Sequence, residues 1–345
     1  MTIKLRFIKQ FSLFVTCIFF LLTLSMCAPQ QKEQANESSS PKEEQPEKIL
    51  TSGISEQTTP LSKVKQPLSW EEINLIKSRF SVPNWQSAGD DGVFVNLNAP
   101  SFINMDVAMP THPVRTLERV IDANLGNTTF ILEDGTETPT MDDYLADDYN
   151  RVQGIIMAHK GKIIYESYPG MNPSDFHIWM SASKTTVGTV CILLEQDGLM
   201  DLAQPVSHYA TDLKGTAWDD VSMKNALNMA SGLDLEETTA AFADPNSWIE
   251  RFFASIFSQE KGSNWLQIMK DVKPIEGEEP GDRFRYSSAV TQALTLAIQG
   301  VTGQSYKDVF NEKIWSKVGA NYQFMVGQTA DGVAVGGGLV YTTIE

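Results

Sequence analysis

The sequence predicts a mixed α+β domain behind a polar N-terminal stretch. A hairpin pattern over residues 151–168 indicates paired strands, and helical apolar periodicity over residues 184–198 and 289–300 indicates packed helices. The chain has 345 residues, 42% of them hydrophobic and 20% charged, which is enough for one large domain with a smaller subdomain. We expect four segments in order, residues 1–27, 28–67, 68–139 and 140–345.

Residues 1–27 have the pattern of a signal peptide. Basic residues precede an apolar run over residues 11–24 that is too short to span a bilayer comfortably. The four residues ending at Cys27 resemble the lipobox of bacterial lipoproteins, although Met26 stands where a small residue is usual. The alternative is ordinary signal-peptidase cleavage near Ala28. Either pattern predicts export to the periplasm, and the lipobox adds membrane anchoring through a lipidated Cys27.

Residues 28–67 are rich in Gln, Glu, Ser, Pro and Lys and hold no aromatic residue. Such a segment cannot bury enough apolar surface to fold, so we expect a disordered tether. The formal charge of −16 argues against a nucleic-acid partner. Three cysteines provide no disulfide framework, and four scattered histidines lack metal-ligand spacing, so we expect neither a metal nor a cofactor.

Residues 68–139 form a predicted N-terminal extension with weaker signals. We expect a short helix over residues 70–80 and a weak helical run over residues 116–123. Between them, the prolines of residues 91–115 indicate irregular or short extended structure. Residues 140–147 then predict a helical turn that Thr140 caps.

Residues 151–168 give the strongest β signal, because two β-rich runs flank a glycine-containing turn. We interpret His159, in that turn, as a solvated residue. The next strong pattern is one apolar helical stripe that ends at Gly198 and consists of Val187, Val190, Cys191 and Leu194.

The second half reads as mostly helical. Ser222 is expected to cap a short helix, and residues 242–269 are expected to be helical. We interpret the aromatic residues of that segment as subdomain core rather than as a lid over a pocket. After a turn at Pro280, Phe284 and Tyr286 are expected to point inward. Residues 289–300 and 306–317 are expected to form two further helices. The three glycines at residues 336–338 are expected to bring the backbone close to another part of the chain.

Ser181 and Lys184 lie three residues apart at the start of the apolar helix, and therefore on one face. A serine hydroxyl is a poor nucleophile until a base removes its proton, and a lysine whose pKa is lowered by burial can do so. The alternative is an N-cap serine beside a solvated lysine. The same spacing occurs elsewhere without an apolar helix, at Ser39/Lys42, Ser62/Lys65 and Ser258/Lys261.

From about Met141 to its end, the chain resembles the serine β-lactamase/penicillin-binding-protein superfamily. The likeness is to its class C-like branch, with the 6-aminohexanoate-dimer hydrolases and family VIII carboxylesterases. It implies a β-lactamase/transpeptidase-like fold, in which helices flank an antiparallel sheet beside a helical subdomain. The motifs that carry it are the hairpin, Ser181-x-x-Lys184, the closing glycines and residues 196–202, 227–233, 280–288 and 314–320.

The resemblance implies that Ser181 is the acylated nucleophile, Lys184 its base and Tyr286 the relay of a proton to the leaving group. Acyl transfer needs such groups within about 3 Å of the reacting centre. We expect the Lys184 ammonium to lower the pKa of the Tyr286 phenol. The backbone N–H of Ser181 is expected to supply half of an oxyanion hole. The alternative for Tyr286 is a buried tyrosine bonded to backbone.

Two departures from the family bear on the substrate. Ser288 stands where the family often has Asn, and we assign it a substrate-binding role. Because a hydroxyl recognises an amide less well than a carboxamide does, ester cleavage is affected less than amide cleavage. No tyrosine lies between Tyr209 and Tyr286, so a substrate-loop tyrosine of the kind that nylon-oligomer hydrolases use is absent.

The family's third motif, Lys-Thr-Gly or His-x-Gly, has no convincing match after Tyr286. We therefore expect the domain to lack its final strands, which would leave the 151–168 hairpin without sheet neighbours. A chain that ends at Glu345 is then expected to be poorly soluble or inactive, and measurable ester turnover would contradict that expectation.

The leading hypothesis is an exported serine hydrolase that cleaves an ester or amide bond of a small molecule. One alternative is a D-Ala-D-Ala carboxypeptidase or a β-lactamase, and another is a catalytically silent, cell-wall-binding lipoprotein. No Gly-x-Ser-x-Gly, P-loop, dinucleotide-binding or His-Glu-x-x-His pattern supports a different enzyme class. The oligomeric state stays open.

Overall fold

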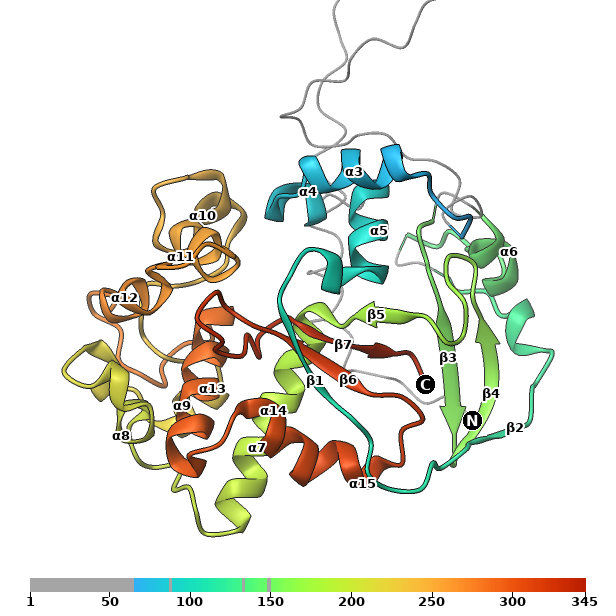
Figure 1. Cartoon of the computed structure of the whole chain (residues 1–345). Helices are drawn as coiled ribbons and strands as arrows, with labels where there is room; N and C mark the ends of the chain where they lie inside the picture. The colour runs from blue at the N-terminus through green and yellow to red at the C-terminus, as the bar shows by residue number, and fades with distance from the viewer. Residues whose placement is uncertain (1–64, 87–88, 132–133, 148–149) are drawn as a thin grey trace, which may run out of the picture. The chain divides into compact units, whose positions relative to one another are not determined.

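The computed structural model describes residues 65–86, 89–131, 134–147 and 150–345 (Figure 1). The predicted signal peptide, the lipidation site at Cys27 and nearly all of the predicted tether lie outside these residues. Among the described residues, no helix is long and apolar enough to cross a membrane.

The N-terminal extension begins with three helices, α3 (Trp70–Ser78), α4 (Val82–Gln86) and α5 (Asp90–Leu97). The Ser69 side chain and Glu72 form a capping box, which explains why the predicted helix starts at Trp70. The expectation of irregular structure after residue 90 is wrong for α5. Its acidic first turn suits a helix N-terminus, and its apolar residues Val93 and Val95 are buried.

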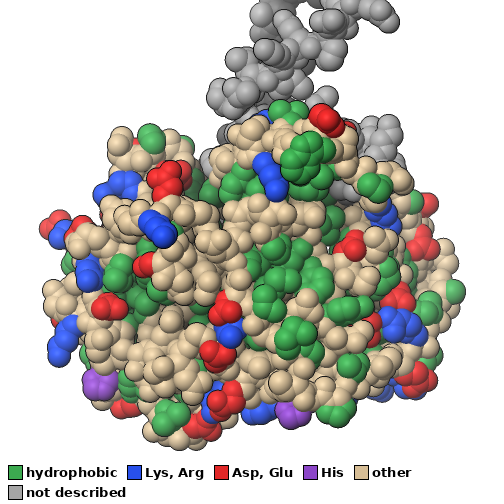
Figure 2. Space-filling model, viewed as in Figure 1, with side chains coloured by type: hydrophobic (Ala, Val, Ile, Leu, Met, Phe, Trp, Pro, Cys, Tyr) green, Lys and Arg blue, Asp and Glu red, His purple; other side chains and the backbone are tan. Residues whose placement is uncertain are grey.

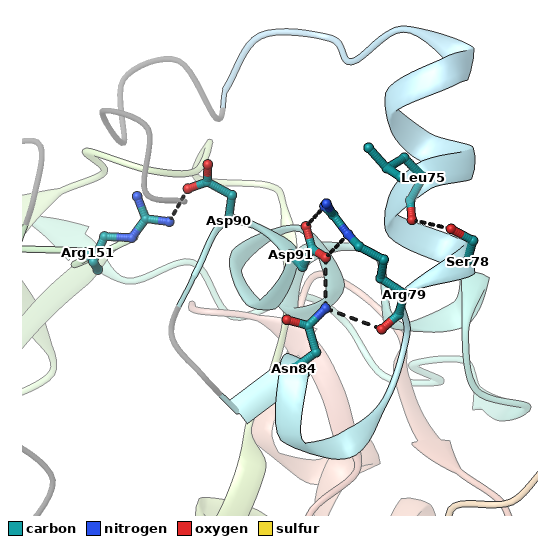
Figure 3. A network of polar contacts seen from close by, with 7 residues as sticks. All are labelled: Leu75, Ser78, Arg79, Asn84, Asp90, Asp91 and Arg151. Atoms are coloured by element: carbon teal, nitrogen blue, oxygen red, sulfur yellow. Dashed lines mark hydrogen bonds and ion pairs between the residues drawn. The ribbon is translucent and has the colours of Figure 1, made fainter. Parts of the chain in front are cut away.

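A polar network fixes these helices to one another (Figure 3). The Arg79 guanidinium donates to both carboxylate oxygens of Asp91, at 2.9 and 2.5 Å, and the Asn84 amide donates to Asp91 at 2.8 Å. Asp90, the neighbour of Asp91, binds the Arg151 guanidinium at 2.8 Å. The extension is therefore tied to the segment that leads into the hairpin.

A four-stranded antiparallel sheet crosses the molecule in the order β1-β6-β7-β5. The extension supplies β1 (Met105–Ala108), whose register places Met105 opposite Gly327. The chain's last strand, β7, lies between β6 and β5, so the sheet joins segments from both ends of the described chain (Figure 1). The other three strands are β5 (Phe176–Ile178), β6 (Phe324–Gly327) and β7 (Val340–Thr343).

A second sheet has the order β2-β4-β3. The predicted hairpin is confirmed as β3 (Ile155–His159) and β4 (Lys162–Ser167), and Lys160 and Gly161 in its turn have φ of 51° and 75°. The expectation that the hairpin lacks sheet neighbours is wrong, because β2 (Glu118–Arg119) pairs with β4 in parallel. The helical run predicted over residues 116–123 is also wrong, because the backbone of this segment forms hydrogen bonds with β4.

The apolar stripe before Gly198 is confirmed as α7 (Lys184–Gln196), with all four stripe residues buried. Gly198 follows the helix with φ of 70°. The central helix α13 (Ser288–Thr302) is almost entirely buried along its first eleven residues. The short helical elements η1 (Ala99–Ser101), η2 (Leu125–Asn127), α6 (Met141–Ala146), α14 (Tyr306–Phe310), η6 (Asn311–Trp315) and α15 (Ser316–Val318) complete this part of the fold.

The predicted helical subdomain gathers on the side of α13 that faces away from the hairpin (Figure 1). Ser222 and Ser247 cap α9 and α11 as N-cap residues. Helix α11 is amphipathic and buries a stripe that includes Ile249, Phe252 and Ile256. The subdomain consists of α8 (Val206–Tyr209), η4 (Thr211–Leu213), η5 (Ala217–Asp219), α9 (Met223–Leu227), α10 (Thr239–Ala243), α11 (Trp248–Ile256) and α12 (Trp265–Lys270).

One hydrophobic core links the extension, the four-stranded sheet and the subdomain, because Trp85, Phe324 and Phe252 belong to a single cluster of buried residues. On the surface in Figure 2, acidic and basic side chains are interspersed, and hydrophobic side chains gather at the centre of the view. The core is what holds the candidate site, since the helices and strands that carry its residues all pack into it.

Candidate functional site

Ser181 lies in the turn that leads from β5 into α7. It belongs to the 3-10 turn η3 (Met180–Ser183), directly before the first residue of α7. Two contacts tie this turn to β7: Trp179 N–H donates to the Val340 carbonyl at 2.8 Å, and Val340 N–H donates to Ser183 Oγ at 3.1 Å. Met180 has a φ of 47°, a conformation that costs free energy for a non-glycine residue and concentrates at functional sites. The fold therefore holds the exposed Ser181 hydroxyl in a fixed position.

Lys184, the first residue of α7, faces Ser181 in the preceding turn η3. Its Nζ lies 3.0 Å from Ser181 Oγ and donates to the Gly337 carbonyl at 2.6 Å. Burial lowers the pKa of Lys184 from 10.5 to about 8, against a smaller opposing attraction by Glu237. A lysine with such a pKa is partly neutral near physiological pH and can accept a proton. The interpretation of Lys184 as a solvated surface residue does not fit this geometry.

Tyr286 completes the cluster. The Lys184 ammonium lies 5.0 Å from the centre of its ring. The Tyr286 phenol also has a hydrogen bond with the Ser181 side chain. The expected lowering of the Tyr286 pKa is wrong: burial raises it, Glu237 raises it further, and the bond with Ser181 opposes both. The phenol therefore keeps its proton near neutral pH, which suits a proton donor.

Glu237 is a site residue that the sequence did not reveal. Its carboxylate accepts the Ser288 N–H and has a hydrogen bond with the Ser288 side chain. Burial raises the pKa of Glu237, while these bonds and the charge of Lys184 lower it. The adjacent Glu236 points instead to Arg285, at 2.6 Å. Nothing in the local sequence distinguishes the two glutamates, because the difference depends on how the chain pairs with the distant Tyr286 segment.

That pairing is held by both backbone and side chains. Glu237 N–H donates to the Tyr286 carbonyl at 2.9 Å, and Arg285 N–H donates to the Met229 carbonyl at 2.7 Å. The Arg285 guanidinium also binds Glu278 at 2.6 Å. In the same segment, the predicted inward orientation is wrong for Phe284, which is 64% exposed. The segment thus presents the Tyr286 side chain to Ser181 and turns Phe284 outward.

A cavity of about 130 Å³ opens beside Ser181. Ser288 lies in its wall, as its predicted substrate-binding role requires, together with Glu237. Most of the wall is apolar and comes from Trp85 in α4, from Val335 and residues 337–339, and from the aromatic segment over residues 242–257. The interpretation of that segment as core alone is therefore incomplete: Phe252 is 1% exposed, yet it and its neighbours also line this cavity.

The arrangement contains the side chains that acyl transfer uses. A nucleophile, a partly neutral amine and a protonated phenol meet beside an apolar cavity, which is the set of groups that such chemistry needs. Among the described residues, no three His, Cys, Asp or Glu side chains gather in a way that could hold a metal ion. Cys191 is buried and free, and burial raises the pKa of its thiol to about 12.

Comparison with known proteins extends this picture. The 6-aminohexanoate-dimer hydrolase of Paenarthrobacter ureafaciens is 27% identical over 244 residues, which are 67% of this chain and 55% of that protein. A beta-lactamase of Providencia stuartii is 44% identical over 55 residues, 16% of this chain and 14% of that protein. A Bacillus anthracis structure described as a 6-aminohexanoate-dimer hydrolase superposes with a TM-score of 0.62 at 18% identity, covering 73% of this chain and 66% of that one.

The chain thus spans little more than half the length of its Paenarthrobacter relative. The family model described as beta-lactamase matches residues 143–330, which is more than half of the chain. The match includes Ser181, Lys184, Tyr286 and Ser288, and the resemblance read from the sequence motifs is confirmed together with the fold class. The chain belongs to the beta-lactamase family and has the β-lactamase/transpeptidase-like fold.

Proposed function

We propose that this protein is a serine hydrolase that cleaves an ester or amide bond of a small molecule through an acyl-enzyme at Ser181. The observation that carries the proposal is the 3.0 Å contact between Lys184 Nζ and Ser181 Oγ, made by an amine whose pKa is lowered to about 8. The hydrolases among its relatives give independent support, since the Paenarthrobacter protein is described as a 6-aminohexanoate-dimer hydrolase.

The proposed reaction has two stages. Ser181 Oγ forms a bond to the substrate carbonyl carbon while Lys184 Nζ accepts the hydroxyl proton. The bond from carbon to the leaving oxygen or nitrogen then breaks, Tyr286 donates its phenol proton to the leaving group, and the Lys184 ammonium returns a proton to Tyr286. A water molecule attacks the acyl carbon in the second stage, releases the carboxylic acid and restores the Ser181 hydroxyl.

Ester substrates fit this site better than β-lactams or peptides. Ser288 stands at the position where the family often has Asn, and its side chain and backbone N–H are both engaged with Glu237. A serine hydroxyl committed to a carboxylate is a weaker partner for a substrate amide than a free carboxamide would be. We therefore place esters ahead of amides as substrates.

The test is covalent labelling with a fluorophosphonate, which transfers its phosphonyl group to an activated serine and releases fluoride. We expect one adduct per chain by intact-protein mass spectrometry, and none in Ser181→Ala. Ser258→Ala is the matched control, because Ser258 has the same spacing to a lysine, Lys261. Equal labelling of Ser181→Ala and the unmodified protein would refute the assignment.

The same proposal places the enzyme outside the cytoplasm, anchored to a membrane through a lipidated Cys27. Its support is the basic and apolar pattern of residues 1–27. Growth with labelled palmitate should mark the protein, and Cys27→Ala should lose the label and release the protein into the soluble periplasmic fraction. Unlabelled protein in the cytoplasmic fraction would contradict both parts.

A further inference from the structure

We propose that the N-terminal extension completes the active-site cavity: Trp85 closes an apolar subsite that takes one short apolar group of the substrate carrying a single hydrogen-bond donor. The proposal rests on the proposed function, because it names the part of the substrate that binds next to Ser181. It goes further because Trp85 precedes the stretch that matches the beta-lactamase family, residues 143–330.

Trp85 is held as part of an aromatic wall that joins two distant segments. Its ring meets Phe257 edge to face, with ring centres 5.9 Å apart, and Phe257 contacts Phe253 at 5.4 Å. Phe253 in turn meets Phe242 edge to face at 5.3 Å. Edge-to-face aromatic pairs of this kind have defined geometry and add to the free energy of burial. The extension and the subdomain thus build one continuous surface of the cavity.

The extension fixes the orientation of Trp85 from behind. The indole N–H donates to Asn96 Oδ1 at 2.8 Å, which leaves the apolar part of the ring for the cavity. Gly92 permits the close approach of α5, because a Cβ there would lie 2.5 Å from the Trp85 carbonyl oxygen. The Arg79–Asp91–Asn84 network in Figure 3 connects the helices on either side of this contact. Trp85 is 3% exposed and therefore has little freedom to move.

The size and chemistry of the cavity define the group that it accepts. At about 130 Å³ it is slightly smaller than an engineered cavity of about 150 Å³ that binds benzene, so it fits one ring or a chain of about six carbons. A charged group would lose hydration against the aromatic wall. The subsite is thus selective for short, uncharged apolar groups.

Gln292 adds one polar requirement. It lines the cavity and is 1% exposed, and its Nε2 donates to the Ala334 carbonyl at 2.9 Å. Its Oε1 is buried and has no hydrogen-bond partner among the described residues. A buried acceptor without a partner is unfavourable, and a ligand O–H or N–H can satisfy it. The group bound beside the aromatic wall is therefore expected to carry one donor.

The experiment measures binding separately from turnover. In the Ser181→Ala variant, 19F NMR titration compares 4-fluorobenzyl alcohol, which has one donor, with 4-fluoroanisole, which has none and a similar size. We expect the alcohol to bind about fivefold or more tightly than the ether. We expect Trp85→Ala to weaken both probes about tenfold, because it removes the aromatic contact. Trp70→Ala is the matched control, since Trp70 lies in the same extension and is 69% exposed.

Two further variants keep the test decisive if Trp85→Ala does not fold. Gly92→Ala should weaken binding by displacing Trp85 while every cavity side chain is retained, and Phe242→Ala should weaken it from the opposite segment. Unchanged binding in these variants would overturn the role of the extension, and equal affinity for the two probes would overturn the role of Gln292.

Turnover then separates this proposal from the proposed function. Esters that vary in the acyl part and esters that vary in the alcohol part show which side of the scissile bond occupies the subsite, because only that series should lose rate beyond about six carbons. Probe binding without Ser181-dependent turnover would support the subsite and refute the hydrolase. Ser181-dependent turnover that Trp85→Ala leaves unchanged would support the hydrolase and refute the subsite.

Discussion

At the scale of single residues, the site depends on the protonation of one amine. Lys184 Nζ contacts both Ser181 Oγ and the Gly337 carbonyl, and a neutral amine can donate to the carbonyl while its lone pair faces the hydroxyl. An ammonium has no lone pair, so it cannot accept the serine proton. In the proposed mechanism, the fraction of neutral Lys184 therefore sets the fraction of active enzyme.

The first prediction is a pH profile. Because burial lowers the pKa of Lys184 to about 8, kcat/KM for an ester should rise with pH and reach half of its plateau near that value. Below this pH the lysine is protonated and the rate should fall about tenfold per pH unit. Initial rates at low substrate concentration, between about pH 6 and 10, measure the profile. A flat profile across this range would show that Lys184 is not the base.

Glu237 should shift that profile, because its negative charge favours the ammonium form of Lys184. In Glu237→Gln the charge is lost, while the amide oxygen can still accept the Ser288 N–H. The pKa of Lys184 should therefore decrease, and the rising limb should move to lower pH. Glu236→Gln is the matched control, since Glu236 binds Arg285 and is not among the groups that shift Lys184. A limb that moves to higher pH in Glu237→Gln would reverse the assigned sign.

At the scale of elements, α3, α4 and α5 depend on a buried ion pair. The side chains of Arg79 and Asp91 are 10% and 4% exposed, and their nearest atoms are 2.5 Å apart. Removal of one partner of such a pair strongly destabilises the folded protein, because the other charge stays buried without a partner. The network in Figure 3 therefore makes the extension sensitive to single substitutions.

Asp91→Ala should destabilise the protein by about 3–5 kcal/mol, since it strands the Arg79 guanidinium and leaves the Asn84 amide with one acceptor fewer. Urea unfolding monitored by tryptophan fluorescence measures the change. The double variant Arg79→Met/Asp91→Leu should lose less unfolding free energy than Asp91→Ala, because no charge remains buried. Glu118→Ala, which breaks the exposed pair with Lys162, should cost about 0–1 kcal/mol. Equal losses for the buried and exposed pairs would contradict this account.

The elements that could be predicted from the sequence are those with local causes. Four apolar positions and a terminal glycine define α7, two β-rich runs around a glycine-containing turn define the hairpin, and capping side chains mark the starts of α6 and α9. The elements that could not be predicted have distant causes. The short strands β1 and β2 exist because they pair with β6 and β4, and their own residues carry little β signal.

The same distinction applies to the candidate site. Ser181 and Lys184 were predicted because they share one helical turn. Glu237 and Trp85 were missed because their positions depend on contacts with Ser288 and Phe257, far away in the chain. The ionisation of Tyr286 was predicted with the wrong sign, because the prediction weighed a neighbouring charge and not the burial that outweighs it.

At the scale of the whole molecule, the site depends on how closely the segment before β7 packs between α7 and α13. A Cβ on Gly336 would lie 2.5 Å from Thr295 Oγ1 and 2.7 Å from Val187 Cγ2, so this position requires glycine. The next residue, Gly337, presents its carbonyl to Lys184 at 2.6 Å. The packing of three separate segments therefore sets the environment of Lys184, the proposed base.

Gly336→Ala should push this segment away from the two helices, because α13 and α7 are anchored in the core on both sides. We expect a loss of about 1–3 kcal/mol in the free energy of unfolding, as for other small-to-large changes in packed interiors. We also expect a shifted pH midpoint, since Gly337 moves relative to Lys184. Gly338→Ala is the control: a Cβ there meets nothing within 4 Å, so stability should be unchanged or slightly higher. If the two alanine variants unfold at the same urea concentration, close packing at Gly336 does not position the base, and Lys184 must owe its lowered pKa to α7 and the Tyr286 segment alone.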